Sequence, residues 1–150
     1  MHILMCNDDG ILADGLRHLA SYLSQYYRIT VVAPANEQSA KSHALTTEVP
    51  LKLDAYNGED ENPRLYALTG TPSDCMKFGL SYLLTDDMPD LVISGINHGF
   101  NLGSDVLYSG TVSAAMESCF YGIPGLALSV ERYSAERGDE MHPFIHELIE

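Results

Sequence analysis

The opening of the sequence reads as a strand, a helix and a second strand in close succession, and this order constrains the fold most. Residues 2–6 form a short apolar run that stops at Asn-Asp-Asp-Gly, as a buried strand ending in a turn does. Apolar residues recur at three- and four-residue spacing over residues 14–26, which predicts an amphipathic helix. Residues 29–33 are a second β-rich run, closed by proline. Such a unit crosses over right-handedly and builds a parallel sheet.

The rest of the sequence continues this alternation. Strands are predicted, the first only weakly, at residues 46–55, 64–69, 90–94 and 125–130, and helices at residues 72–84, 111–121 and 143–150. The run at 90–94 is apolar enough for a strand buried on both faces, and a glycine-rich segment follows it. We therefore expect an α/β fold: a Rossmann-like open, mostly parallel sheet with helices on both faces. The length of 150 residues suits a single domain.

The formal net charge of −13 argues against a nucleic-acid duplex as partner, because a duplex is itself a polyanion. A small phosphorylated substrate stays possible but would need a cation at the site. No apolar run is long enough for a membrane span, and no basic stretch precedes the first apolar run. Cys6, Cys75 and Cys119 are odd in number and lack Cys-x-x-Cys spacing, which predicts small buried thiols in a reducing cytoplasm.

Three loops are expected to carry the chemistry. In open parallel sheets, ligands bind beyond the carboxyl ends of the strands, and this rule selects residues 7–10, 34–43 and 95–111. The same loops are the most polar and the richest in glycine and serine. Two independent arguments therefore point to one edge of the sheet.

Asp8 and Asp9 are adjacent carboxylates at the end of the first strand. Each raises the proton affinity of the other unless a cation offsets them, and a hard divalent ion such as Mg²⁺ or Mn²⁺ does so. The alternative is an Asx turn that caps the next helix. Asn97 and Ser39 lie in the other two loops and have oxygens that could complete the coordination; alternatively Asn97 adopts a left-handed turn and Ser39 is an ordinary loop serine.

The segment Ser109-Gly110-Thr111 opens a helix, and its backbone N–H groups could hold an anion. Simple N-capping by Ser109 or Thr111 is the alternative. The glycines match neither the dinucleotide-binding nor the P-loop pattern. His98 could donate to a phosphate or be solvated, while His142 and His146, four residues apart, are interpreted as surface histidines in the absence of a third metal ligand.

Taken together, these loops resemble the SurE family, the stationary-phase survival protein and 5'-nucleotidase. The resemblance spans most of the chain, and its motifs are Asn7-Asp8-Asp9-Gly10, Val32-Ala33-Pro34, Gln38-Ser39, Gly70-Thr71-Pro72-Ser73-Asp74-Cys75, Ser94-Gly95-Ile96-Asn97, Gly99, Asn101-Leu102-Gly103, Asp105-Val106, Tyr108-Ser109-Gly110-Thr111-Val112 and Ala114-Ala115-Met116-Glu117. Ala40 departs from the family pattern, in which glycine usually follows the serine.

The resemblance implies hydrolysis of nucleoside monophosphates, and sometimes short polyphosphate, with one divalent ion (Mg²⁺ or Mn²⁺) per subunit. It implies that Asp8, Asp9, Ser39 and Asn97 bind the metal. It also places Ser109, Gly110 and Thr111 near the substrate phosphate. Family members are longer, and their C-terminal part makes oligomer contacts. The resemblance thus implies a chain shortened at its C-terminus, and a homodimer or higher oligomer where that part is present.

The leading hypothesis is metal-assisted phosphomonoester hydrolysis, in which one of the two aspartates, Asp8 or Asp9, also orients the attacking water. Asn97 and the amides of residues 109–111 would hold the phosphate oxygens. One rival is an inactive nucleotide- or metal-binding module. A second is an aspartyl-phosphate phosphatase with Asp8 as nucleophile, against which no Asp-x-Asp pair follows the first strand.

Overall fold

A sheet of six strands forms the centre of the structure, a computed structural model that describes residues 1–58 and 60–150. The strand order is β3-β4-β2-β1-β5-β6, and the pairing is parallel except between β3 and β4. The strands are β1 (His2–Cys6), β2 (Arg28–Pro34), β3 (Leu53–Ala55), β4 (Arg64–Leu68), β5 (Leu91–His98) and β6 (Gly125–Val130). The expected open, mostly parallel sheet is confirmed.

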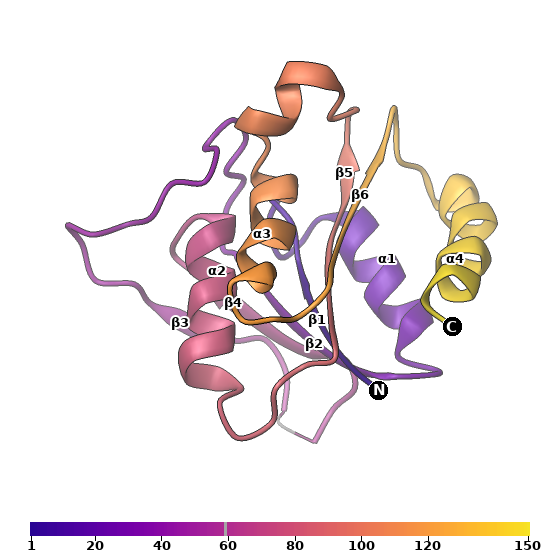
Figure 1. Ribbon diagram of the computed structural model, residues 1–150. Helices are drawn as coiled ribbons and strands as arrows, with labels where there is room; N and C mark the ends of the chain where they lie inside the picture. The colour runs from indigo at the N-terminus through magenta and orange to yellow at the C-terminus, as the bar shows by residue number, and fades with distance from the viewer. Residues whose placement is uncertain (59) are drawn as a thin grey trace.

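Four α-helices cover the described sheet (Figure 1). They are α1 (Asp14–Leu23), α2 (Pro72–Phe78), α3 (Gly110–Cys119) and α4 (Ala135–Ile149). A π-helical turn, Gly79–Leu83, continues α2, and a 3₁₀ turn, Gly103–Tyr108, precedes α3. Helices α1 and α4 pack together on one face of the sheet, and α2 and α3 pack together on the other.

Two apolar layers result from this arrangement. Between the sheet and α1 lie side chains such as Ile3, Met5 and Leu19, and between the sheet and α2 lie Leu4, Val32 and Met76. All of β1 is buried, as expected of a central parallel strand with helices on both faces. Among the described residues, no helix is both long and apolar enough to cross a bilayer.

Several element boundaries differ from the sequence prediction. Helix α1 ends at Leu23, and only residues 53–55 of the weakly alternating stretch form a strand. The last helix begins at Ala135, not near Pro143, because Ser134 caps it by accepting a bond from the Arg137 N–H. Pro143 is tolerated inside α4, whose Ile145 is buried against the core formed with α1.

Two expectations about single residues were wrong. His142 is buried rather than on the surface, because α4 lies across α1 and brings its ring 5.3 Å from the ring of Tyr22. All three cysteines are free, but only Cys6 and Cys75 are buried; Cys119 is exposed at the end of α3. Burial raises the pKa of the Cys75 thiol well above its usual value.

Strand β5 extends through Asn97 to His98, whereas the sequence predicted a loop from Gly95 onward. Gly95 has φ +129, and a side chain there would collide with the carbonyl oxygen of Leu128 on β6. The β5–β6 register shifts between Ser94 and Asn97 at the same place, as in a β-bulge. Asn97 is therefore held at the end of a strand and not in a loose loop.

The chain order places a switch point between β1 and β5. From β1 the chain adds β2 and β4 on one side of β1, and then crosses to add β5 and β6 on the other side. In such sheets the connections leaving the two flanking strands diverge and open a crevice at their carboxyl ends. Asp8 and Asp9 follow β1, and Asn97 and His98 end β5, so both groups lie at this crevice.

Candidate functional site

A cavity of about 460 Å³ lies at the carboxyl edge of β1 and β5. Five of the seven sequence-predicted site residues line it: Asp8, Asp9, Ser39, Asn97 and Ser109. Glu37 and Phe100, which belong to none of the sequence motifs, also line the cavity, as does His98, the candidate phosphate donor. The rest of the lining comes from residues that were named only for the family pattern: Ala40, Gly99, Asn101, Asp105 and Tyr108. The three predicted loops thus meet in one place.

The turn after β1 settles one alternative reading of the aspartates. Asn7 closes this turn: its Oδ1 accepts from the Gly10 N–H at 3.1 Å and its Nδ2 donates to the Gly10 carbonyl at 3.1 Å. The N-cap of α1 is Ala13, and the helix start has no side-chain cap bond. The carboxylates of Asp8 and Asp9 therefore serve neither as Asx-turn acceptors nor as helix caps.

Asp8 is 6% exposed and packs against the start of α3. Its Oδ1 accepts a hydrogen bond of 2.6 Å from the Thr111 hydroxyl. A Cβ on Gly110 would lie 2.9 Å from the Asp8 Cβ, so only glycine allows the helix to come this close. The backbone carbonyl of Asp8 accepts from the Gln38 N–H at 2.7 Å, and this bond connects the Ser39 loop to the end of β1.

Asp9 is half-buried beside Asp8. Burial raises its pKa above the usual value, and the neighbouring charge of Asp8 raises it further. A backbone N–H of His98 lowers the pKa and offsets part of this shift. The pair therefore holds negative charge at an electrostatic cost, which a bound cation would relieve.

Ser39 and Asn97 face the same cavity from two other elements. The Ser39 hydroxyl donates to Glu37 Oε1 at 2.6 Å, so its oxygen lone pairs stay available. The Asn97 Nδ2 donates to the Gly99 carbonyl at 2.7 Å, which fixes the amide orientation and leaves Oδ1 as the oxygen able to accept. Ala40 adopts a left-handed conformation, φ 57, at the place where glycine is the less strained choice.

The start of α3 combines capping with contact to Asp8. Ser109 is the N-cap, and its hydroxyl accepts from the Val112 N–H at 3.1 Å. The Thr111 side chain turns inward to Asp8, so Gly110 and Thr111 lie behind the cavity wall and not on it. The N–H groups of the first helical turn have no acceptor within the helix.

The cavity is strongly acidic. Asp8, Asp9, Glu37 and Asp105 line it, and its lining, among the described residues, includes neither lysine nor arginine. A phosphate dianion would be repelled from such a surface unless a cation lay between them. Glu37 and Asp105 lie in the segments 34–43 and 95–111, which follow strand ends. That position was the sequence signal that they could line a ligand site.

The donor set decides which metal could fit. Within residues 1–58 and 60–150, no three His, Cys, Asp or Glu side chains gather as a metal site. An ion here would be held by two carboxylates with neutral oxygens from serine and asparagine. Such an oxygen-only set fits Mg²⁺ or Mn²⁺ and does not fit zinc, which prefers nitrogen and sulfur ligands.

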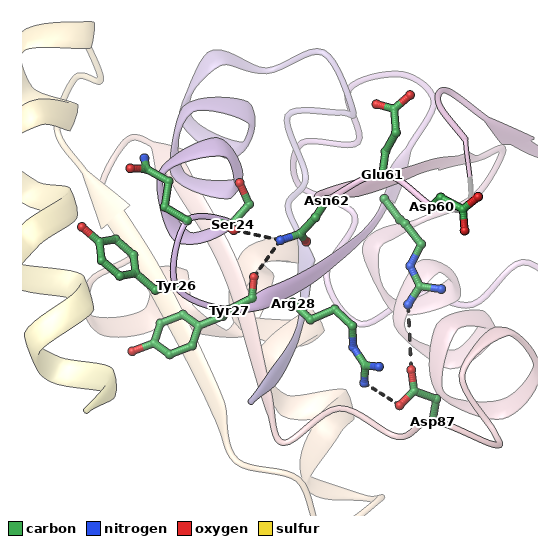
Figure 2. A pocket seen from close by; sticks show the side chains of 10 residues that line it. Ser24, Tyr26, Tyr27, Arg28, Asp60, Glu61, Asn62 and Asp87 are labelled. Carbon is green, nitrogen blue, oxygen red and sulfur yellow. Dashed lines mark hydrogen bonds and ion pairs between the residues drawn. The ribbon is translucent and has the colours of Figure 1, made fainter.

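A second cavity of about 470 Å³ lies away from these loops, between the end of α1 and β4 (Figure 2). Several of its polar groups are paired with one another: Arg28 reaches Asp87 at 2.5 Å, and the Asn62 amide donates to the carbonyls of Ser24 and Tyr27. It lies at the amino end of β2, opposite the switch point. The acidic cavity is therefore the candidate functional site.

The fold and the acidic cavity define a class: doubly wound α/β proteins with an oxygen-lined cavity at the switch point of the sheet. Comparison with known families is more specific, because the family model "Survival protein SurE" matches residues 3–150. The chain belongs to the SurE family. This confirms the resemblance read from the loop motifs.

Similar proteins share most of this chain but extend beyond it. The 5'-nucleotidase SurE of Thermoanaerobacter sp. (strain X514) is 49% identical over the whole chain, which covers 59% of that protein. The 5'-nucleotidase SurE of Vibrio vulnificus (strain YJ016) is 50% identical over 87% of the chain and 49% of its own length. The crystal structure of the SurE protein from Aquifex aeolicus has a TM-score of 0.86 at 38% identity, covering 99% of this chain and 58% of that one.

Proposed function

We propose that this protein is a metal-dependent phosphatase that hydrolyses nucleoside 5'-monophosphates, and also 3'-monophosphates and short polyphosphate. The observation that carries the proposal is the acidic cavity at the switch point, with its two aspartates and without a lysine or arginine among its described lining residues. Relatives that share this chain's full length of sequence bear the name 5'-nucleotidase SurE, which supports the same reaction class.

In this proposal Asp8, Asp9, Ser39 and Asn97 hold one divalent ion, Mg²⁺ or Mn²⁺. Support comes from their common cavity, from the oxygen-only chemistry of the set and from the raised pKa of Asp9. When bound, such an ion polarises a phosphoryl oxygen and lowers the pKa of water. The positive ion would also reduce the repulsion between the carboxylates of Asp8 and Asp9 at the end of β1.

The chain's own residues would bind the phosphate and orient the water. Asn97 and Ser109 line the cavity, and the first N–H groups of α3, which follow Ser109, lack acceptors within the helix and would bind phosphate oxygens. One of Asp8 and Asp9 would orient the attacking water. Asp9 is the better placed of the two, because it is less buried than Asp8, whose Oδ1 already accepts from the Thr111 hydroxyl.

Two aromatic rings favour a nucleotide over a simple phosphate ester. Phe100 and Tyr108 line the cavity at the two ends of the segment between β5 and α3, and they are 54% and 63% exposed. Exposed rings beside a phosphate site are suited to stack on a base, an interaction worth about 1–3 kcal/mol. Asp105, between them in sequence, is available to accept from a ribose hydroxyl or a base amine.

An aspartyl-phosphate mechanism with Asp8 as nucleophile fits the geometry less well. Asp8 is almost fully buried and its Oδ1 is bonded to Thr111. An attacking carboxylate needs free access to the phosphorus and usually a nearby cationic side chain. We therefore favour attack by water.

The experiment is a substrate panel assayed with Mg²⁺, with Mn²⁺ and with EDTA. It contains 5'-AMP, 3'-AMP, ribose 5-phosphate and tripolyphosphate, and phosphate release is measured. We expect release from 5'-AMP that EDTA abolishes. Activity that survives EDTA would contradict the metal assignment. Silence across the panel, with Mn²⁺ binding retained, would instead support the rival interpretation as a nucleotide- or metal-binding module.

A further inference from the structure

The loop that contains Ser39 connects β2 to β3 and lacks regular structure. Two buried carboxylates from the helices on one face of the sheet hold it, Asp74 of α2 and Glu117 of α3. Asp74 accepts from the Thr46 N–H at 2.9 Å and from the Thr46 hydroxyl at 2.6 Å. It also completes the capping box of α2, so it has a structural task in its own helix.

Glu117 has no such task. It is 5% exposed, and its Oε2 lies 2.6 Å from His43 Nε2. A carboxylate only accepts hydrogen bonds, so the ring nitrogen of His43 is the donor. Glu117 occupies the last turn of α3, where a negative charge opposes the helix dipole, and burial adds to the cost. The bond to His43 is what offsets these costs.

Helix α3 therefore contacts the end of β1 with its first turn and the Ser39 loop with its last. Its first turn packs on Asp8 through Gly110 and Thr111, and its last turn holds His43. The residue before His43, Ser42, donates its N–H to the Tyr108 carbonyl at 3.2 Å, just ahead of the helix. A single rigid element thus sets the distance between the aspartate pair and the Ser39 loop.

The segment between these anchors is strained. Ala40 and Ser42 both have left-handed backbones, φ 57 and φ 51, which residues with a Cβ adopt at a cost. Such conformations persist only where the surroundings enforce them. Gln38, bonded to the Asp8 carbonyl, holds one end of the strained segment, and Ser42 with His43 holds the other.

We propose that His43 and Glu117 are a positioning pair that keeps Ser39 in the geometry needed for metal binding. The proposal rests on the proposed metal site. Neither residue lines the cavity, so the pair acts through the loop and not on the substrate. Partners of this outer kind change metal affinity by about 10- to 100-fold when removed.

The test is calorimetric titration with Mn²⁺ of the wild-type protein and of the Glu117→Gln, His43→Gln and doubly substituted variants. We expect the Mn²⁺ dissociation constant to rise about 10-fold or more in each. The double variant should lose no more than the single ones, because both substitutions break one link. With saturating Mn²⁺, the KM for 5'-AMP should stay close to that of the wild type. Glu136→Gln is the matched control. Glu136 is an exposed residue of α4, and its substitution removes the same charge far from the Ser39 loop.

Each outcome separates the inference from the proposed function. If the wild-type protein binds no Mn²⁺, the proposed metal site itself fails. If the wild type binds and Glu117→Gln binds equally well, only the positioning role fails, even where the melting temperature has dropped. His43→Gln changes a residue on the surface side of the pair, so it gives the same information if the buried Glu117→Gln variant does not fold.

Discussion

The Thr111 hydroxyl donates to Asp8 Oδ1 at 2.6 Å, joining the first turn of α3 to the end of β1 across 103 positions of sequence. Both groups are buried, so the bond is protected from competing water. It fixes one oxygen of Asp8, and Asp8 itself lines the cavity. The orientation of the first proposed metal ligand is therefore set by the helix that also opens the proposed phosphate site.

Replacement of Thr111 by valine should weaken the site and the fold together. A hydrogen bond to a charged group contributes about 1.5–3 kcal/mol, and removal of this one leaves a buried carboxylate oxygen unpaired. We expect a lower free energy of unfolding in urea and a loss of Mn²⁺-dependent turnover. Thr111→Ser keeps the hydroxyl and is the control. Equal activity of the valine and serine variants would show that the bond does not orient Asp8.

Replacement of Gly110 by alanine should displace α3 from Asp8. The added Cβ would lie 2.9 Å from the Asp8 Cβ and 3.0 Å from the Pro72 Cγ, closer than packed atoms allow. Overpacking of this kind costs about 1–3 kcal/mol, which exceeds the gain in helix propensity from alanine. Turnover of 5'-AMP should fall with the stability measured in urea. Gly58→Ala is the control, since its nearest atom would lie 3.9 Å away.

Replacement of Tyr108 by alanine should affect nucleotides more than sugar phosphates. If a base stacks on this ring, about 1–3 kcal/mol of binding is lost. The KM for 5'-AMP should rise about 10-fold, a change of about 1.4 kcal/mol, while the KM for ribose 5-phosphate stays constant. Tyr108→Phe keeps the ring and should behave like the wild type. An equal rise in KM for both substrates would show that Tyr108 maintains the structure of the loop and does not stack on the base.

Stability should fall as the pH drops from about 7.5 toward 5.5, because two histidines are buried. Burial lowers the pKa of His2, with Arg28 adding to the effect, and burial likewise lowers the pKa of His142. Below about pH 6.5 these two histidines bind protons in the unfolded chain more readily than in the folded chain. Their contribution to the free energy of unfolding is therefore fully present above this pH and is lost as the pH falls below it.

Urea unfolding in EDTA across this pH range measures the effect, and EDTA keeps any metal from contributing. The slope of unfolding free energy against pH should be positive and should flatten in His2→Gln and in His142→Gln. His2→Gln is expected to cost stability at every pH as well, because the His2 ring bonds Thr30 Oγ1 at 3.0 Å. A slope unchanged in both variants would show that other groups control the pH dependence.

The strand and helix pattern could be predicted because it depends on local periodicity. The first βαβ unit and the starts of the helices at Pro72 and after Ser109 all follow from residues near one another in sequence. The predicted last helix, residues 143–150, is only the end of α4, which begins at Ala135 after its N-cap Ser134. Tertiary packing of α4 on α1 overrides the proline and also buries His142.

The meeting of the three loops could be predicted from the strand-end rule, but the arrangement within the site could not. Nothing local indicates that Asn7 closes the turn, that Thr111 bonds Asp8, or that His43 reaches Glu117. Each of these depends on how far α3 and the loop approach β1. The extension of β5 to His98 was missed for the same reason, because Gly95 fits there only in contact with β6.

The most direct test of the central claim is turnover of 5'-AMP in Mn²⁺ by the wild-type protein and by Asp9→Asn. The substitution keeps the shape of the side chain and removes the negative charge of Asp9. Burial and the Asp8 charge both raise the pKa of Asp9, which means that they oppose this charge. The melting temperature without metal should therefore stay the same or increase. We predict that turnover falls by at least about 100-fold, since even partners outside the ligand set cost about 10- to 100-fold. Wild-type turnover by Asp9→Asn would contradict the assignment of the aspartate pair as the metal site.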